Sequence, residues 1–430
     1  IDELARDFDL ADVLPLTPLQ QGLLFQTGFA EAGGDGSGDD VYAVQLDVAL
    51  TGVVDEVRLR DAVLTVLKRY PNLVARFYEG FGEPVQIIPA DPVLAWQYLD
   101  LDGSSELDSR VERFCAAERA AVCELGNQPA FRAALIRTST DQYRFIITNH
   151  HIVLDGWSKP IVVRDIFGAY FGSRLPAPVP YRRFISWLAR QDNDAARAAW
   201  AGVFDGFEAP ALVAPAGRML LGRRDVQTFR LPAETTNAVG ELARASHTTV
   251  STILQAAWAQ LLVSLTGRGD VAFGTAVSGR PTDVSGSESM VGLLINTVPI
   301  RATITSETTL EDLVHQLQTA HADTVEHQHL ALNEIHRATG QDQIFDTLFV
   351  FENYPVDLTA MSDMSGLTIT NFVNREFNHY PLAVQAVPGD ELVLRIEYDI
   401  DVFSSVRIGK LVGRFRKVLG SMTADVEEQP

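Results

Sequence analysis

The chain has 430 residues, of which 46% are hydrophobic and 21% are charged, and this globular composition and length predict two or three units with cores of their own. Its formal net charge of −21 argues against a nucleic-acid partner, because phosphate groups would be repelled. No apolar run is long enough to span a bilayer and no signal peptide is recognisable, so we expect a cytoplasmic protein without a membrane partner. The chain starts at Ile1 without Met and ends in Glu-Glu-Gln-Pro, and we therefore expect it to be part of a longer polypeptide.

The first part of the chain alternates between helical and strand-like spacing. Thr17 caps and Pro18 opens a predicted helix that runs to Ala30. Further strands are predicted over 41–51, 73–78, 84–88, 131–137 and 143–148, and further helices over 57–69, 107–123 and 158–171. The two cysteines, Cys115 and Cys123, fall in one of these helices, where we expect reduced thiols rather than a disulfide framework.

A proline-rich segment separates the two halves of the chain. Leu175-Pro-Ala-Pro-Val-Pro180 favours a stiff, extended linker. Beyond it, helices are predicted over 249–265, 310–326 and 406–419, and strands over 270–277, 293–304, 345–351, 367–373, 382–387 and 392–398. Because both halves mix helices with strands, we predict two lobes of α/β or α+β type, residues 1–175 and 181–430, joined by residues 176–180.

The segment with the most chemical information is Asn149-His-His-Ile-Val-Leu-Asp-Gly-Trp-Ser158. His150 and His151 end a predicted strand, and Asp155 and Gly156 form a tight turn, so an imidazole and a carboxylate are expected at a rim, where they suit proton handling near neutral pH. Side chains alternate along a strand, and His150 should therefore point away from His151. Asp155 needs an arginine partner, because a buried unpaired carboxylate is costly. Two adjacent histidines are equally compatible with strand-end residues whose rings bond to backbone groups.

Other chemistries find less support in the sequence. Five further histidines could share a helix face in part, but no His-Glu-x-x-His and no cysteine cluster accompanies them, so we expect no metal site. These histidines are His315, His321, His327, His329 and His336. There is no Gly-x-Ser-x-Gly turn, no Gly-x-Gly-x-x-Gly segment and no phosphate loop, which argues against a serine nucleophile and against a nucleotide cofactor.

Several ordered blocks give the chain a resemblance to the condensation domains of nonribosomal peptide synthetases, over nearly its whole length. His150, His151, Asp155 and Gly156 match the HHxxxDG signature of that family. The other similar blocks are Leu14–Phe25, Lys68–Phe77, Tyr181–Trp187, Val291–Arg301, His327–Leu330 and Phe351–Pro355. One block alone would be suggestive, whereas ordered blocks across both predicted lobes make the resemblance specific.

The resemblance implies two lobes similar to chloramphenicol acetyltransferase, arranged as a V-shaped pseudodimer, with the histidine motif at their junction midway along a tunnel. It also implies that an upstream donor and a downstream acceptor carrier protein each present a thioester on a phosphopantetheine arm. The amine of the acceptor would attack the donor peptidyl thioester and form an amide bond. The domain itself would bind no cofactor, and an adenylation domain would be adjacent in the same polypeptide.

The resemblance, taken with the chemistry of an amine and a thioester, assigns roles to five residues. His151 is expected to take the proton of the attacking amine, or to hydrogen-bond the amine and orient it. The Gly156 amide and the start of the following helix would polarise or position the thioester carbonyl. His150 and Asp155 are expected to support the loop, with Asp155 paired to Arg280 of the second lobe.

The branch of the family and the rival functions complete the predictions. Leu19–Phe25 and Phe351–Asp357 resemble the branch that joins a D-configured donor to an L-acceptor, and an L-donor stays open. Both histidines are kept, unlike in the cyclisation and recruitment branches, and the Glu-Gly-His-Gly-like segment of the epimerisation branch is missing. Asn374–Pro381 resembles the condensation form instead. The rivals are a noncatalytic docking module for carrier proteins and an acyltransferase that uses coenzyme A.

Overall fold

Residues 9–33, 41–80, 82–126, 128–215, 223–352 and 366–427 are described by a computed structural model. Packing groups the chain into two units. The first unit contains Ile1–Arg190, Arg280–Ile295 and Tyr354–Phe377, and the second contains Gln191–Gly279, Asn296–Asn353 and Asn378–Pro430. Two segments from the second half of the sequence therefore pack with the first unit, whereas the sequence prediction treated each lobe as one continuous stretch.

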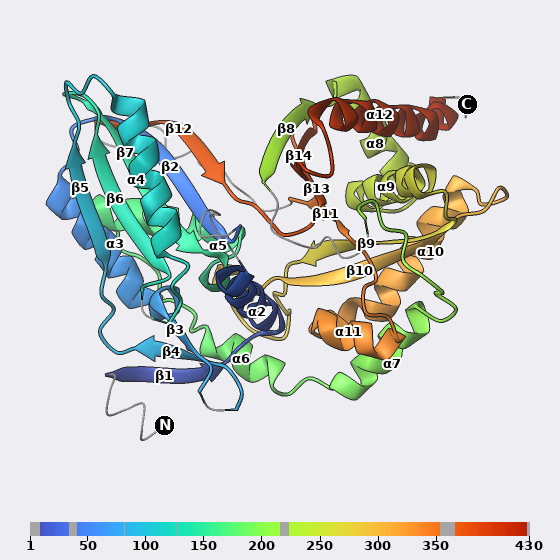
Figure 1. Cartoon of the computed structure of the whole chain (residues 1–430), viewed down its shortest axis with the longest axis horizontal. Coiled ribbons are helices and arrows are strands. Elements are labelled where there is room, and N and C mark those ends of the chain that lie inside the picture. The colour runs from blue at the N-terminus through green and yellow to red at the C-terminus, as the bar shows by residue number, and fades with distance from the viewer. Residues whose placement is uncertain are drawn as a thin grey trace. The chain divides into compact units, whose positions relative to one another are not determined.

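A five-stranded sheet forms the centre of the first unit (Figure 1). Its strand order is β12-β2-β7-β6-β5, and neighbours are antiparallel except for the parallel pair β5 and β6. The strands are β2 (Ala43–Gly52), β5 (Ala95–Asp100), β6 (Phe131–Arg137), β7 (Gln142–His150) and β12 (Leu367–Arg375). Because β12 comes from a late segment, the sheet brings residues near 375 to the strands that lead into the histidine motif.

Alternating side chains give this sheet two apolar faces, as expected for strands covered on both sides. On one face, Ala134, Ile136 and Ile146 pack in a small cluster with the helix α4 (Leu107–Ala121). On the other face, Leu135 and Ile147 belong to the main core of the unit. The two faces thus hold separate clusters from consecutive residues of the same strands.

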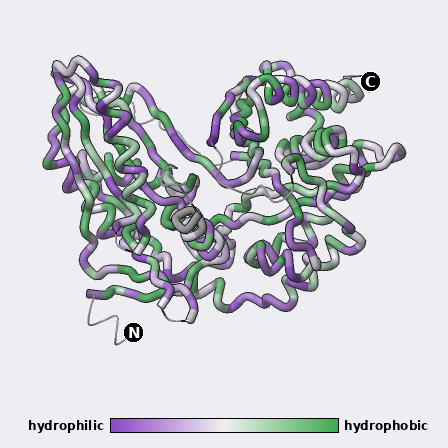
Figure 2. The backbone as a smooth tube through the Cα atoms, in the orientation of Figure 1, coloured by the Kyte–Doolittle hydropathy of each residue, from purple (hydrophilic) through white to green (hydrophobic). Residues whose placement is uncertain are grey.

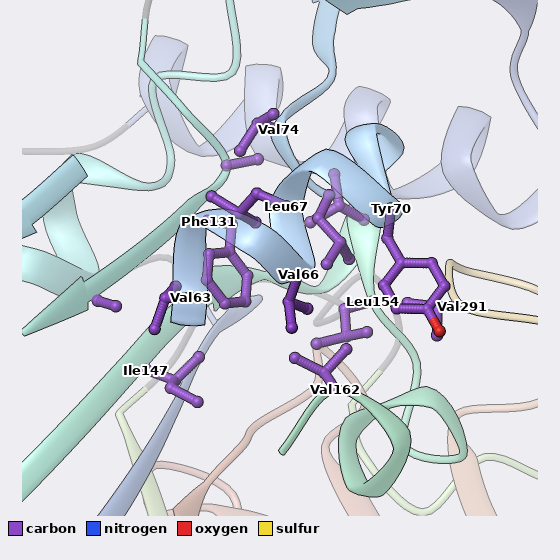
Figure 3. Close-up of a cluster of buried hydrophobic side chains, with 14 of the residues drawn as sticks. Val63, Val66, Leu67, Tyr70, Val74, Phe131, Ile147, Leu154, Val162 and Val291 are labelled. Atoms are coloured by element: carbon purple, nitrogen blue, oxygen red, sulfur yellow. The ribbon is translucent and has the colours of Figure 1, made fainter. Parts of the chain in front are cut away.

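The helices α3 (Glu56–Arg69) and α5 (Ser158–Tyr170) supply the main core of the first unit. Figure 3 shows Val63 and Leu67 of α3 beside Phe131 of the sheet, with Val162 of α5 close by. Each fully buried side chain of this size contributes about 1.5–3 kcal/mol relative to an exposed one. This packing fixes α5, whose first turn follows the histidine motif directly.

A second, three-stranded sheet of the first unit has the order β1-β4-β3. Its elements are β1 (Leu10–Pro15), β3 (Arg76–Tyr78) and β4 (Val85–Pro89), with the helices α2 (Pro18–Gly33) and α6 (Arg182–Leu188) in the same unit. The predicted strand 73–78 is wrong in its first part, because Pro71–Val74 forms a short 3₁₀ helix, η1. Proline at the start of η1 fixes a helical φ there.

The second unit is built on a six-stranded sheet of order β10-β9-β11-β13-β14-β8. Its strands are β8 (Arg224–Arg230), β9 (Asp270–Val277), β10 (Asn296–Thr303), β11 (Thr347–Phe351), β13 (Leu382–Val387) and β14 (Val393–Asp399). β11 runs parallel to β9 and β13, and the other neighbours are antiparallel.

Helices of the second unit belong to two core clusters. The larger cluster includes residues of α8 (Ala233–Ala245), α9 (Val250–Thr266), α10 (Leu310–Thr324) and α12 (Ser405–Glu427), and the smaller one includes residues of α7 (Asn193–Val203) and α11 (Leu332–Thr339). Figure 2 shows hydrophilic and hydrophobic residues mixed along α12, as expected for an amphipathic helix with one side in the core. Among the described residues, no individual helix combines the length and apolar character needed to cross a bilayer, although the sharply bent pair α8 and α9 meets those criteria when taken together.

Candidate active site

The histidine motif starts where β7 leaves the sheet. The last residue of β7, His150, lies opposite Ala43 of β2, and its N–H donates to the carbonyl of Ala130 at 2.8 Å. The N–H of His151 donates to the carbonyl of Tyr42, also at 2.8 Å. His151–Val153 then forms a single 3₁₀ turn, η2. Backbone hydrogen bonds to both neighbouring segments therefore fix the main chain of the two histidines, independently of their side-chain contacts.

His150 is completely buried and bonds within the first unit through both ring nitrogens. Its Nδ1 accepts a hydrogen bond from the N–H of Ile152 at 3.1 Å. Its Nε2 lies 3.2 Å from the hydroxyl oxygen of Thr27 in α2. Since Nδ1 is an acceptor, the proton of the neutral ring is on Nε2, which donates to Thr27. The ring closes the η2 turn and connects it to α2.

His151 keeps part of its surface, with 14% of the side chain exposed. Its Nε2 lies 3.0 Å from Oε1 of Glu376, just after β12. The other oxygen of Glu376 forms an ion pair with the ammonium group of Lys159 in α5. Within the residues that the structure describes, Nδ1 of His151 is shielded from solvent and has no hydrogen-bond partner.

Glu376 is an ionised carboxylate at this site. Its burial acts to raise its pKa, but the charge of Lys159 and the hydrogen bond from His151 outweigh burial and hold the pKa of Glu376 well below its usual range. A carboxylate in this state only accepts hydrogen bonds, so His151 and Lys159 donate to it, as does the side-chain amide of Asn374 at 3.1 Å.

Asp155 is fully buried and accepts hydrogen bonds at both carboxylate oxygens. Its Oδ1 accepts from the N–H of Ser158 at 2.8 Å, and its Oδ2 accepts from the N–H of Leu294 at 2.9 Å. The guanidinium of Arg280 donates to both oxygens, at 3.2 and 3.3 Å. The carboxylate therefore caps α5 and links it to residues 280–294, which lie in the same unit rather than in a second lobe.

The predicted blocks of the sequence meet around this loop. Asn72 donates to the carbonyl of Val291 at 3.0 Å, and the hydroxyl of Tyr181 donates to the carbonyl of Leu293 at 2.7 Å. Gln20 donates to the carbonyl of Ile152 at 3.0 Å. Blocks that are separated in sequence thus hold the backbone of the motif and of the segment that pairs with Asp155.

Gly292 is required by close approach in that segment. It has a φ of +158°, and a Cβ atom there would lie 2.5 Å from the ring of Tyr181 and 3.1 Å from the amide nitrogen of Asn72. Its carbonyl accepts from the N–H of Asp155 at 3.0 Å. Gly156, the other motif glycine, is partly exposed in the turn that precedes α5.

The remaining histidines do not gather into a site. In the described part of the chain, no group of three or more His, Cys, Asp or Glu side chains is arranged to hold a metal ion. The carbonyl of His327 accepts from the indole N–H of Trp200 at 3.0 Å, so this residue helps to pack α7. Burial, followed by the charge of Arg224, lowers the pKa of His379 to about 4.

Sequence reasoning missed Glu376 and Lys159 as members of the site. Asn374–Pro381 was interpreted only as a marker of the family branch, and no pattern reveals that this segment meets a helix that begins at Ser158. One signal was available: Lys159 is the second residue of α5, where the helix dipole disfavours a cation. A lysine at that position indicates an anion nearby.

Comparisons with known proteins identify the family of the chain. A family model described as "Condensation domain" matches residues 10–429. The chain is 34% identical to chondramide synthase cmdD of Chondromyces crocatus over 93% of its own length, and 32% identical to bacitracin synthase 3 of Bacillus licheniformis, also over 93%. It spans 11% and 6% of the lengths of these two relatives.

Solved structures show the same fold. The first condensation domain of the CDA synthetase superposes with a TM-score of 0.76 at 20% identity, covering 96% of this chain and 97% of that one. A mutant of the starter condensation domain of the rhizomide synthetase RzmA, in complex with C8-CoA, gives 0.79 at 19% identity, covering 96% and 95%. The predicted fold class, two α/β lobes similar to chloramphenicol acetyltransferase, is confirmed, as is the family resemblance. The chain belongs to the condensation domain family.

Proposed function

We propose that this chain forms an amide bond between a donor peptidyl thioester and the amine of an acceptor aminoacyl thioester, as the condensation domain of a nonribosomal peptide synthetase. The new C–N bond replaces the C–S bond of the donor, and the proton lost by the amine ends on the released thiolate. His151 takes this proton in passing or orients the amine by a hydrogen bond.

The observation that carries the proposal is that the residues of the motif differ in burial. His150 and Asp155 are buried, and their polar atoms bond to the loop itself. Of these three residues, His151 is the one that keeps exposed surface, with 14% of its side chain exposed. A group that acts on a substrate must be accessible to it, and His151 meets this requirement where His150 and Asp155 do not.

The thioester carbonyl needs a hydrogen-bond donor as its oxygen becomes negative. The first amide of α5, on Ser158, already donates to Asp155 and is therefore occupied. The sequence predicted two donors for this oxygen, the Gly156 amide and the start of α5. We therefore assign this role to the Gly156 amide. Since a thioester is an activated acyl group, positioning of the two reactants supplies much of the rate enhancement.

The substrates, on this proposal, arrive on phosphopantetheine arms of an upstream donor and a downstream acceptor carrier protein, and the domain binds no cofactor of its own. An adjacent adenylation domain, a cytoplasmic location and a site reached through a tunnel belong to the same proposal. So does a D-configured donor, which was inferred from Leu19–Phe25 and Phe351–Asp357; residues 353–357 lie outside the described part of the chain.

A reconstituted transfer reaction tests the proposal. A donor carrier protein loaded with a peptide and an acceptor carrier protein loaded with an amino acid are mixed with the chain, and the acceptor-bound product is identified by mass spectrometry. Product is expected with the wild type and with H315A, which changes an exposed histidine of α10, and a large loss is expected with H151A.

Two arms of the same experiment separate the rival functions. A docking module would bring the carriers together without chemistry, so equal product with wild type and H151A would refute the catalytic proposal. In the second arm, coenzyme A thioesters replace the loaded carrier proteins. If the chain is an acyltransferase that uses coenzyme A, it should form product from these thioesters as fast as from the carriers. Donors of either configuration show whether the D-form is preferred.

A further inference from the structure

The helix α2 contacts the turn η2 at two points on one face. Gln20 and Thr27 are two helical turns apart, so their side chains point to the same side of α2. Both residues are buried, with 1% and 4% of their surface exposed. Gln20 donates to the carbonyl of Ile152 at 3.0 Å, and the hydroxyl oxygen of Thr27 lies 3.2 Å from Nε2 of His150. The helix therefore holds both the backbone of the turn and the ring of the first motif histidine.

The side-chain amide of Gln20 has one orientation that satisfies its neighbours. Its Oε1 accepts from the N–H of Thr17 at 2.9 Å and from Nε2 of Gln86 at 3.1 Å. A rotated amide would place its NH₂ group against these two donors and its oxygen against the carbonyl of Ile152. The donor of Gln20 therefore has to face the turn.

Gln86 fixes the other side of this pair of amides. It lies in β4, the central strand of the three-stranded sheet, and is 1% exposed. Its Nε2 also donates to the carbonyl of Pro15, the last residue of β1, at 2.9 Å. The two glutamines thus connect the small sheet with the backbone that follows the histidines. A buried polar network of this kind holds one arrangement, because other arrangements leave polar atoms without partners.

The first turn of α2 does not need a glutamine at position 20 for its own stability. Thr17 and Gln20 form a capping box: the hydroxyl of Thr17 accepts from the N–H of Gln20 at 3.2 Å, and the side chain of Gln20 accepts from the N–H of Thr17. A glutamate completes such a box equally well. It lacks the Nε2 donor that reaches Ile152, so capping alone does not account for glutamine here.

We propose that Gln20 and Thr27 are positioning residues for His151: they hold the two groups on either side of it, the ring of His150 and the carbonyl of Ile152. This inference rests on the proposed function of the chain. It gives α2 a part in the transfer reaction, through contacts that lie outside the HHxxxDG signature.

The contacts from α2 act on the residues directly before and after His151. The N–H of Ile152 donates to the ring of His150 and its carbonyl accepts from Gln20, so the peptide groups on both sides of Ile152 are fixed. A side chain that acts on a reacting group has to be held within about 0.5 Å of its working position. Misplacement by about 1 Å can lower a rate 10²-fold. Loss of either contact should therefore slow the transfer without weakening substrate binding.

The alternative is that both bonds only fasten α2 to the first unit. Their loss would then lower the stability of the protein, and the molecules that stay folded would transfer the peptide at the normal rate. Turnover measured well below the unfolding midpoint therefore separates the two roles.

Steady-state kinetics with loaded carrier proteins test the positioning role. Q20M keeps the length of the side chain and removes its polar atoms, and T27V keeps the volume and removes the hydroxyl. Each should lower kcat about 10- to 10²-fold, while KM for the acceptor stays within about twofold. T27S keeps the hydroxyl and should restore most of kcat. The matched control is Q21M, the same substitution at the next residue, which is exposed on α2, and wild-type kcat is expected there.

Two kinetic results would overturn the proposal. The first is wild-type kcat in folded Q20M and T27V. The second is a T27S protein as slow as T27V, because the hydroxyl would then not be the group that holds the histidine turn. If Q20M does not fold, T27V and T27S decide the question between them.

Amide hydrogen exchange of Ile152 tests the support of the turn without any substrate. Its N–H is bonded to the ring of His150, and loosening of η2 in Q20M and T27V should raise its exchange rate about tenfold or more, with no change in Q21M. An unchanged rate in both variants would contradict the proposal.

The two measurements also separate this proposal from the proposed function. If the wild type makes no peptide but the variants show faster exchange at Ile152, the amide-forming assignment fails and the support of the turn by α2 stands. If the wild type makes peptide and both variants keep its kcat, the function stands and the positioning role fails.

Discussion

The carboxylate of Asp155 and the guanidinium of Arg280 form an ion pair in which 0% and 3% of the two side chains are exposed. Both groups also bond to the segment between Met290 and Leu294: Arg280 donates to the carbonyl of Met290, and Asp155 accepts from the N–H of Leu294. The pair therefore fixes two loops at once, the one that carries His151 and the one that packs on it.

Removal of Arg280 should destabilise the first unit severely. In R280A the buried charge of Asp155 keeps two backbone donors but loses its counterion, and breaking such a pair costs about 3–5 kcal/mol. We expect a clear fall in the urea midpoint of unfolding, with loss of peptide formation. R280K keeps the charge but not the bidentate geometry, and its urea midpoint should lie between those of R280A and the wild type. An unchanged midpoint and full activity in R280A would show that the pair does not support the loop.

A methyl group at Gly292 should displace the segment that packs on the motif. The new Cβ of G292A would lie 2.5 Å from the ring of Tyr181, and Tyr181 cannot move without losing its hydrogen bond to Leu293. We expect a loss of about 1–3 kcal/mol, measured by chemical denaturation.

A helical glycine with open space around it supplies the control for G292A. Gly240 in α8 has nothing within 4 Å of an added Cβ, so G240A should be neutral or slightly stabilising, by up to about 1 kcal/mol. Equal stability of G292A and the wild type would mean that the close approach to Tyr181 relaxes at little cost.

Acid should destabilise the second unit through His379. Burial, and then the charge of Arg224, lower the pKa of His379 to about 4 in the folded protein, while an unfolded histidine titrates near pH 6.5. Between these values the unfolded state binds more protons, so this stabilisation is complete above about pH 6.5 and is lost as the pH falls toward 4. The full effect is about 3 kcal/mol. H379Q should show a shallower fall of the unfolding midpoint between pH 6.5 and 4, and an identical slope in both proteins would contradict this origin.

The sequence predicted the parts of the fold that have strong internal periodicity. β9 occupies the predicted 270–277, and α9 and α10 start within one residue of the predictions. β5 and β8 were missed because each is the outer strand of its sheet and has no fully buried residue, which removes the apolar alternation. The predicted strand at 293 begins at Asn296 instead, because Leu294 uses its N–H to bind Asp155.

The site was predictable where adjacent residues carry it, and not where it depends on distant segments. The spacing of His150, His151 and Asp155 predicted an imidazole and a carboxylate in one loop, and the structure has both there. The contact of His151 with Glu376 joins β7 to the end of β12, and only the formed sheet brings these strands together. A lysine at the start of α5 was the one local sign that a carboxylate was near.

The rate of a single turnover tests the central claim most directly, namely that the ring of His151 takes part in the transfer. Donor and acceptor carrier proteins, both fully loaded, are mixed with an excess of the chain, and the acceptor-bound peptide is followed over time. H151A should be slower than the wild type by about 10²–10⁴-fold, with an unchanged unfolding midpoint. A folded H151A that transfers the peptide at the wild-type rate would contradict the account.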